Sequence, residues 1–312
     1  MIERVVEVGL PVDETLVIVR NRLQPEVLTG NEKRIAVVTG THGDELEGQF
    51  VCYLLNHVIQ KNIEHLKGII DIYPALNPMG IDSITRGIPM FDIDMNRIFP
   101  GNEQGATAEY VAAGIMKDLN GADLCIDIHS SNIFLQELPQ IRINEQSVYD
   151  LMPYAKHLNM DFIWVHSAAT VLESTLAYSL NQIGVPTLVV EMGVGMRIDT
   201  ENGRQLVNGI LNVMKEMGIW TGVTEPVRRP IISTDGYVGY INAEKSGIFV
   251  PQAEHLDHVK QGDQVGVIVS PLTGEVLQRI AAPCDGMIFT LREYPVVNEG
   301  SLIARILGGA VA

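Results

Sequence analysis

Two histidines and a glutamate have the residue types and the spacing of a catalytic metal site. His42 and Glu45 lie three positions apart directly after an apolar run, and His129 ends a second apolar run. Two imidazoles and one carboxylate form a ligand set of catalytic zinc, which keeps a fourth position open for water. The spacing His-x-x-Glu also occurs by chance, and a histidine at a strand end is often only a polar surface residue. These three residues alone therefore leave both interpretations open.

Asp127 precedes His129 by two residues, so both side chains would lie on one face of a strand. A carboxylate in that position can accept a hydrogen bond from the ring nitrogen that does not bind the metal, and so orient the histidine ligand. The other histidines outside the C-terminal quarter have no ligand-type residues beside them and are interpreted as structural; they are His57, His65, His157 and His166.

Arginine and asparagine side chains gather in a loop-rich stretch that follows Asn77-Pro-Met-Gly80. They are Arg86, Asn96 and Arg97, and the last two stand in Asp94-Met-Asn96-Arg97. A guanidinium group binds a carboxylate or a polarised carbonyl through two hydrogen bonds, and asparagine adds a neutral one. A solvated loop with a surface network of arginine and aspartate is the alternative interpretation.

Glu191 ends the apolar run Thr187–Glu191 and precedes a glycine-rich turn. An acid in such a place must be neutralised, paired or functional, because an unpaired buried charge is costly. Burial raises a carboxyl pKa, which suits a general base that works near neutral pH. A structural carboxylate that caps the following turn is the competing explanation.

The elements that position these residues have the pattern of an α/β fold. Short apolar runs at residues 34–39, 68–75, 124–128 and 186–192 predict buried strands, and amphipathic stretches between them predict helices. Such alternation is typical of a sheet with parallel strands and helices on both faces. The carboxyl ends of parallel strands meet at one edge of the sheet, where ligands bind. His42 and His129 are expected to meet there.

The pattern changes near Thr224-Glu-Pro226. Beyond this point short β-rich runs recur between glycine, proline and aspartate, and no amphipathic helix is evident. We expect a catalytic α/β domain over residues 1–225 and a β-rich domain over residues 226–312.

Composition excludes several partners. The chain of 312 residues carries 22 Lys+Arg against 38 Asp+Glu, a net charge of −16, so it would repel nucleic acid and anionic membranes. No apolar run approaches the roughly 18 residues needed to cross a bilayer. The three cysteines form no disulfide pattern and no secretory signal is evident, which favours a cytoplasmic location. A homo-oligomer is compatible with the sequence.

The ordered motifs together resemble the succinylglutamate desuccinylase/aspartoacylase family, which is related to the zinc metallocarboxypeptidases. The resemblance extends from about residue 34 to 200 and rests on His42-x-x-Glu45, Asn77-Pro-x-Gly80, Arg86, Asp94-x-Asn96-Arg97-x-Phe-Pro-Gly, Asp127-Ile-His129-Ser and Val190-Glu191-x-Gly193. It implies a carboxypeptidase-like mixed sheet with helices on both faces. In the tail, Ser246–Pro251 and Val259–Gly266 resemble a biotinyl/lipoyl-like module, but the lysine of true carrier domains is absent.

Carried over to this chain, the resemblance implies one Zn2+ per chain, held by His42, Glu45 and His129. Glu191 would be the general base that activates water and then protonates the leaving amine. Arg86 would polarise the scissile carbonyl, while Asn96 and Arg97 would hold the carboxylate of the substrate. The expected activity is removal of an acyl group from a small N-acyl amino acid or a related amide.

Two departures from aspartoacylase put N-acetylaspartate and similar dicarboxylates in doubt. Residues 177–186 contain no arginine to bind a second carboxylate, and the C-terminal tyrosine of that enzyme has no clear counterpart. Arg142 and Arg197 are the candidates for contacting a different side chain. The alternatives are a zinc carboxypeptidase that acts on short peptides and a non-catalytic metabolite-binding protein.

Overall fold

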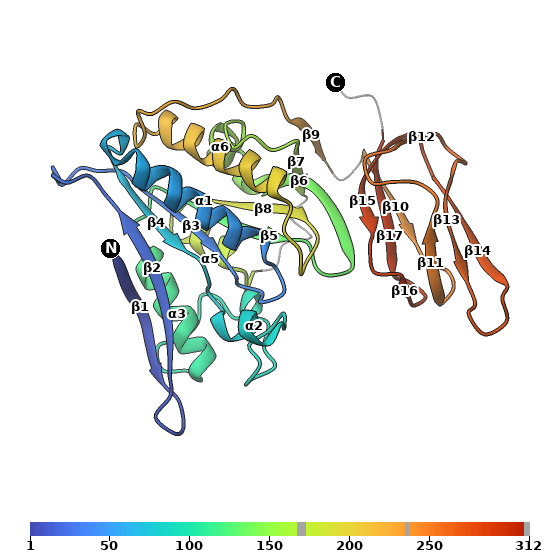
Figure 1. The fold of residues 1–312 in the computed structure, drawn as a ribbon, viewed down its shortest axis with the longest axis horizontal. Coiled ribbons are helices and arrows are strands. Elements are labelled where there is room, and N and C mark those ends of the chain that lie inside the picture. The colour runs from blue at the N-terminus through green and yellow to red at the C-terminus, as the bar shows by residue number, and fades with distance from the viewer. Residues whose placement is uncertain (167–172, 235–236, 309–312) are drawn as a thin grey trace.

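The computed structural model describes residues 1–166, 173–234 and 237–308. Within them, a sheet of thirteen strands runs through the molecule, with the main order β1-β2-β4-β3-β5-β8-β6-β15-β17-β10 (Figure 1). Its N-terminal strands are β1 (Ile2–Gly9), β2 (Thr15–Leu23), β3 (Arg34–Thr39), β4 (Ile69–Tyr73), β5 (Leu124–Ser130), β6 (Leu135–Asn144), β7 (Phe162–His166), β8 (Thr187–Gly193) and β9 (Ile231–Thr234).

The centre of this sheet is parallel, and an antiparallel pair joins it to the strands on each side. Strands β4, β3, β5 and β8 pair in parallel, so their carboxyl ends share one edge. Strand β6 then pairs antiparallel with β8, and β7 and β9 continue in parallel beside β6. The expectation of a mixed sheet is confirmed.

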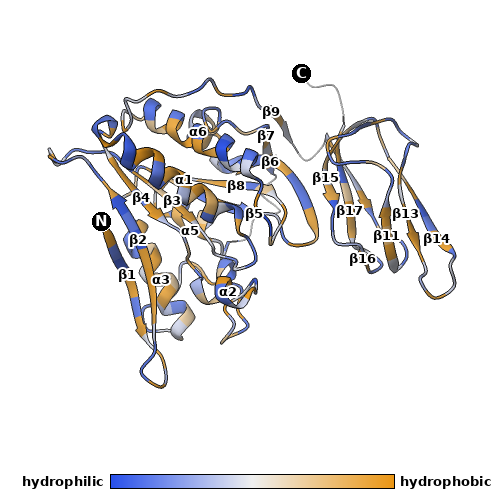
Figure 2. Cartoon of the chain, in the orientation of Figure 1, coloured by the Kyte–Doolittle hydropathy of each residue, from blue (hydrophilic) through white to orange (hydrophobic). Residues whose placement is uncertain are grey.

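Helices cover both faces of the sheet. They are α1 (Glu47–Lys61), α2 (Pro78–Ser83), α3 (Thr107–Leu119), α4 (Val148–Ala155), α5 (Leu176–Gln182) and α6 (Thr200–Glu216), with 3-10 turns η1 (Ile63–His65), η2 (Met95–Arg97) and η3 (Glu145–Ser147). One core joins α1, α4 and α6 to one face, and a second core joins α3 and α5 to the other. In Figure 2, the central strands β3 and β4 are mostly hydrophobic, whereas α1 and α6 also carry hydrophilic residues.

The C-terminal part is β-rich and lies at one end of the molecule in Figure 1. Its strands are β10 (Val238–Asn242), β11 (Gly247–Pro251), β12 (His258–Val259), β13 (Gln264–Val269), β14 (Val276–Ala281), β15 (Gly286–Arg292), β16 (Val296–Val297) and β17 (Leu302–Leu307). Strands β14, β13, β11 and β16 make a second sheet. Strand β15 pairs with β6, so the large sheet continues from the α/β part into the C-terminal part.

Sequence patterns locate most central elements but omit β6. The run Leu135–Asn144 contains Pro139, with Gln136 and Glu137 before it, so its first half does not alternate like an ordinary strand. The structure accommodates the proline where the β6–β8 register shifts, between Glu137 and Gln140. This strand carries residues that are important for the site. No helix in the described part of the chain is both long enough and apolar enough to span a bilayer.

Candidate active site

A buried loop between β3 and α1 carries the first two candidate ligands. The sequence predicts a helix from about Glu45, whereas α1 begins at Glu47 and Glu45 lies in the loop. The loop packs tightly against the start of α2: a Cβ atom on Gly43 would lie 2.0 Å from a backbone carbon of Gly80. The Gly43 N–H donates to the carbonyl of Arg86 at 3.2 Å. The segment from Asn77 onward therefore supports the loop that carries His42.

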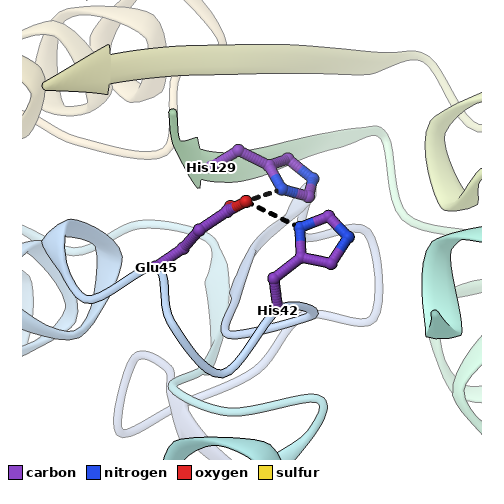
Figure 3. A group of neighbouring side chains, drawn as sticks. All are labelled: His42, Glu45 and His129. Atoms are coloured by element: carbon purple, nitrogen blue, oxygen red, sulfur yellow. Dashed lines mark hydrogen bonds and ion pairs between the residues drawn. The ribbon is translucent and has the colours of Figure 1, made fainter. Parts of the chain in front are cut away.

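The third candidate, His129, lies near the carboxyl end of β5, beside this loop. Because β3 and β5 pair in parallel, their ends bring the two histidines together, as the sequence predicts. His42 Nδ1 lies 2.8 Å from Glu45 Oε1, and His129 Nδ1 lies 2.9 Å from Glu45 Oε2 (Figure 3). All three side chains are buried, and their ligand atoms lie within 4.8 Å of one another.

Carboxylates lie behind both imidazole rings. His42 Nε2 lies 3.0 Å from Asp94 Oδ1, and His129 Nε2 lies 3.2 Å from Asp127 Oδ2. Each ring thus has its Nδ1 toward Glu45 and its other nitrogen toward an aspartate. The sequence suggested this role for Asp127 only. Asp94 belongs to the motif Asp94-Met-Asn96-Arg97, in which the sequence assigned a role to Asn96 and Arg97 but none to Asp94.

The donor set fits a divalent cation. Both Nδ1 atoms and the Glu45 carboxylate converge, and the outer aspartates can orient the rings, as they do around protein-bound zinc. Burial alone would raise the pKa of Glu45, but His129 and His42 hold it well below its usual range. Burial would lower the pKa of His129, but Asp127 and Glu45 outweigh it and raise that pKa. Three carboxylates around two imidazoles favour a bound positive charge.

Arg86 connects the metal-binding cluster to the cavity. Its Nη1 donates to Glu45 Oε1 at 3.0 Å, and its Nε lies 3.4 Å from Asp94 Oδ2. The Arg86 side chain is 40% exposed and lines the same cavity as the three candidate ligands. It can therefore reach a carbonyl group placed beside the ligand atoms.

The turn η2 supplies Asn96 and Arg97 to the cavity. Asn96 Oδ1 accepts the backbone N–H of Leu176 at 2.9 Å, which ties η2 to the first residue of α5. Arg97 donates to the carbonyl of Asn96 at 2.7 Å and has no carboxylate partner among the described residues. Of the arginines that line the cavity, Arg97 is thus the one available for an anionic group of a ligand.

Glu191 lies beside the cluster because β8 pairs in parallel with β5, which places it next to His129 in register. Its side chain is 17% exposed and lines the cavity. Burial raises the pKa of Glu191, although the nearby Arg142 guanidinium opposes that shift. Arg142 Nη1 donates to Glu191 Oε1 at 3.2 Å.

Sequence reasoning missed the residues that hold Arg142. Glu137 on β6 is 2% exposed, and its Oε1 accepts from Arg142 at 3.3 Å and from Arg305 of β17 at 2.8 Å. Thr290 of β15 also donates to Glu137. Of the two arginines that the sequence offers for contacting a substrate side chain, Arg142 lines the cavity. Arg197 forms an exposed ion pair with Glu293 and does not line the cavity. Arg305 and Glu137 are 168 residues apart in the sequence and meet only through the pairing of strands, so no local sequence pattern predicts their contact.

The cavity that these groups share has a volume of about 430 Å³. It is lined by all seven residues that the sequence proposes for the site, and also by Arg142, Arg305 and His166. Of these three, His166 was interpreted from the sequence as structural. Residues 31–217 match the model of the succinylglutamate desuccinylase/aspartoacylase catalytic domain.

The chain belongs to the succinylglutamate desuccinylase/aspartoacylase family.

A curated relative, the N-alpha-acetyl-L-2,4-diaminobutyric acid deacetylase of Halomonas elongata, is 26% identical over 297 residues, which are 90% of this chain and 84% of the relative. Two solved structures share the fold. A succinylglutamate desuccinylase from Silicibacter sp. TM1040 superposes with a TM-score of 0.85 at 21% identity, covering 98% and 94% of the two chains. The product-bound ectoine utilization protein EutE (DoeB) from Ruegeria pomeroyi gives 0.82 at 19% identity, covering 97% and 93%. The curated relative is a deacetylase and the family is named for deacylating enzymes, which supports a hydrolase here.

Proposed function

We propose that the protein is a zinc-dependent amidohydrolase that removes the acyl group from a small N-acyl amino acid or a related amide. The observation that carries this proposal is one cavity in which the cluster His42, Glu45 and His129 adjoins a carboxylate suited to act as a base and a guanidinium group, that of Arg97, with no carboxylate partner among the described residues. Membership of a family of deacylases supports the same reaction type.

The proposed metal ligands are His42 Nδ1, His129 Nδ1 and the Glu45 carboxylate. When bound, zinc supplies a water of lowered pKa and a Lewis acid for a carbonyl oxygen. Glu191 accepts a proton from the attacking water, and its raised pKa keeps it a competent base near neutral pH. It then returns the proton to the leaving amine nitrogen. Arg86 donates to the carbonyl oxygen as negative charge develops there.

Asn96 and Arg97 bind the substrate's carboxylate in this proposal. Arg97 contributes a guanidinium group without a competing ion pair, and Asn96 contributes its side-chain N–H2 because its oxygen is used by α5. Fixing the carboxylate holds the scissile amide between Glu191 and the candidate ligands.

We also propose the division into a catalytic domain, residues 1–225, and a biotinyl/lipoyl-like module, residues 226–312, whose first strand, β9, returns to pair with β7 of the catalytic domain. Arg305 and Thr290 of this module contact Glu137 at the cavity. Arg305 of this module also lines the cavity, and we propose that the module limits access there and so favours small substrates over peptides. Cys52, Cys125 and Cys284 are free thiols, which supports a cytoplasmic location.

The test is release of free amino acid from a panel of N-acetyl, N-succinyl and N-formyl amino acids by the zinc-loaded enzyme. Glu191→Gln is the matched control, because it keeps the shape of the side chain and removes only the base. We expect release by the wild type and a loss of several orders of magnitude in kcat for the variant. Equal rates for the two proteins would eliminate Glu191 as the base. Cleavage of short peptides in place of the panel would favour the carboxypeptidase alternative.

A further inference from the structure

The cavity continues past Glu191 along the face of the sheet that is opposite α1 and α6. On β8, Leu188 and Val190 belong to the core beneath α1 and α6, so Thr187, Val189 and Glu191 face the other way. Thr187 lies four residues before Glu191, roughly 13 Å away at about 3.3 Å per residue. We call this extension the slot; it is lined by Asn144, Ala177, Tyr178, Asn181, Thr187 and Val189.

The slot begins where the substrate's carboxylate is proposed to bind. Asn96 is hydrogen-bonded to Leu176, the first residue of α5, and α5 supplies Ala177, Tyr178 and Asn181 to the slot wall. Strand β6 continues the floor of the slot beside β8, since Arg142 is the in-register neighbour of Val189. A substrate whose α-carboxylate is bound at η2 therefore directs the side chain on its α-carbon into the slot, between α5 and β8.

The charges near the slot are balanced. Arg142 and Arg305 are matched by two carboxylates, Glu137 and Glu191, within ion-pair distance. None of the six side chains that line the slot is a carboxylate, a lysine, an arginine or a histidine, although His166 also lines the cavity. Among the described residues that line the slot, a second carboxylate would find no free cation, and an ammonium group would find no free carboxylate. Either charge would be desolvated without a partner, which is costly.

Asn144 offers an unused hydrogen-bond donor. Its Oδ1 accepts the backbone N–H of Gln146 at 2.9 Å, which fixes the orientation of the amide. Its Nδ2 is buried and has no hydrogen-bond partner among the described residues. A buried donor of this kind favours a ligand that brings an oxygen acceptor. Asn181, by contrast, is already hydrogen-bonded to the backbone of Thr187.

Resting on the proposed function, we infer that the slot selects an uncharged polar amino-acid side chain with a terminal oxygen acceptor, such as the carboxamide of glutamine. The acceptor binds Asn144 Nδ2, and the balanced charges reject acidic and basic side chains. This selectivity differs from that of the named relative, whose substrate, Nα-acetyl-2,4-diaminobutyrate, carries a basic side chain.

The experiment is calorimetric binding of free L-glutamine, L-glutamate, L-lysine and L-alanine to the zinc-loaded enzyme near pH 8, where an imidazole of ordinary pKa is neutral. Glutamine and glutamate have the same shape and differ in charge. We expect glutamine to bind at least tenfold more tightly than each of the other three. Glutamate or lysine binding as tightly as glutamine, or no amino acid binding, would overturn the inference.

Two variants test the role of Asn144. Asn144→Ala should bring the glutamine-to-alanine affinity ratio close to one, while Asn144→Asp should favour lysine over glutamine. An unchanged ratio in both would remove Asn144 from the slot, and the wild-type comparison remains decisive if either variant fails to fold. Hydrolysis of N-acetyl-L-alanine is measured in parallel. Hydrolysis without glutamine selectivity contradicts this inference alone, whereas selective glutamine binding without any hydrolysis contradicts the proposed function alone.

Discussion

Replacing Arg142 with glutamine should move the acidic limb of the pH–activity profile to higher pH. Glu191 works as a base only when it is deprotonated, so activity falls as the pH drops through its pKa. Burial raises that pKa, and the Arg142 guanidinium at 3.2 Å opposes the rise. Removing this positive charge takes away the largest of the effects that lower the pKa of Glu191, so that pKa must rise further.

The size of the shift follows from the geometry of the pair. An opposite charge this close lowers a carboxyl pKa by about 1–3 pH units. The two side chains are 27% and 17% exposed, so solvent screening places the effect near the lower end. We expect the acidic limb of kcat/KM to shift up by about one pH unit. Glu137 retains its contact with Arg305 in the variant, so the buried carboxylate keeps a partner.

The assay is kcat/KM for N-acetyl amino acid hydrolysis from about pH 5 to 9. Arg142→Lys keeps the charge and should leave the limb close to its original position. Arg197→Gln is the matched control, because Arg197 forms an exposed ion pair with Glu293 and lies outside the cavity. An Arg142→Gln profile that superposes on the wild type would refute the electrostatic role of Arg142.

Three further substitutions test separate parts of the account. His129→Ala should lower the bound zinc below one equivalent in elemental analysis, and full occupancy would reassign the site. Arg97→Ala should raise KM at least tenfold with a smaller change in kcat, since a carboxylate contact acts equally in ground and transition states; an unchanged KM would exclude that contact. Asp71→Ala should destabilise the fold by about 3–5 kcal/mol in urea, because Arg20, Arg22 and Arg34 all lie within ion-pair distance of this fully buried carboxylate. The exposed Glu7→Gln, by comparison, should cost less than about 1 kcal/mol.

Local patterns were sufficient for the parallel centre of the fold. Residues 34–39 and 124–128 are apolar, short and bounded by turn residues, so they predict buried strands with His42 and His129 at one edge. The structure has both strands, paired in parallel. The three candidate ligands depend on these two neighbouring strands and one loop. Their grouping therefore follows from short-range signals.

The second half of the cavity depends on contacts that no local pattern carries. Strand β6 contains a proline at a register shift, and its Glu137 and Arg142 have the residue types of a solvated segment. Their role becomes evident only when β15 pairs with β6 and β17 pairs with β15, which places Arg305 of β17 beside Glu137. A buried network of ion pairs and a solvent-exposed one contain the same residue types, so only the tertiary fold distinguishes them.

The central claim is that a bound metal ion and Glu191 together hydrolyse an amide bond. Its most direct test is zinc content by elemental analysis, combined with amino-acid release before and after treatment with a chelator. The account predicts one zinc per chain, loss of release when zinc is removed and recovery when it is restored. Undiminished release by fully metal-free protein would contradict the account, as would a protein that binds no metal under any loading condition.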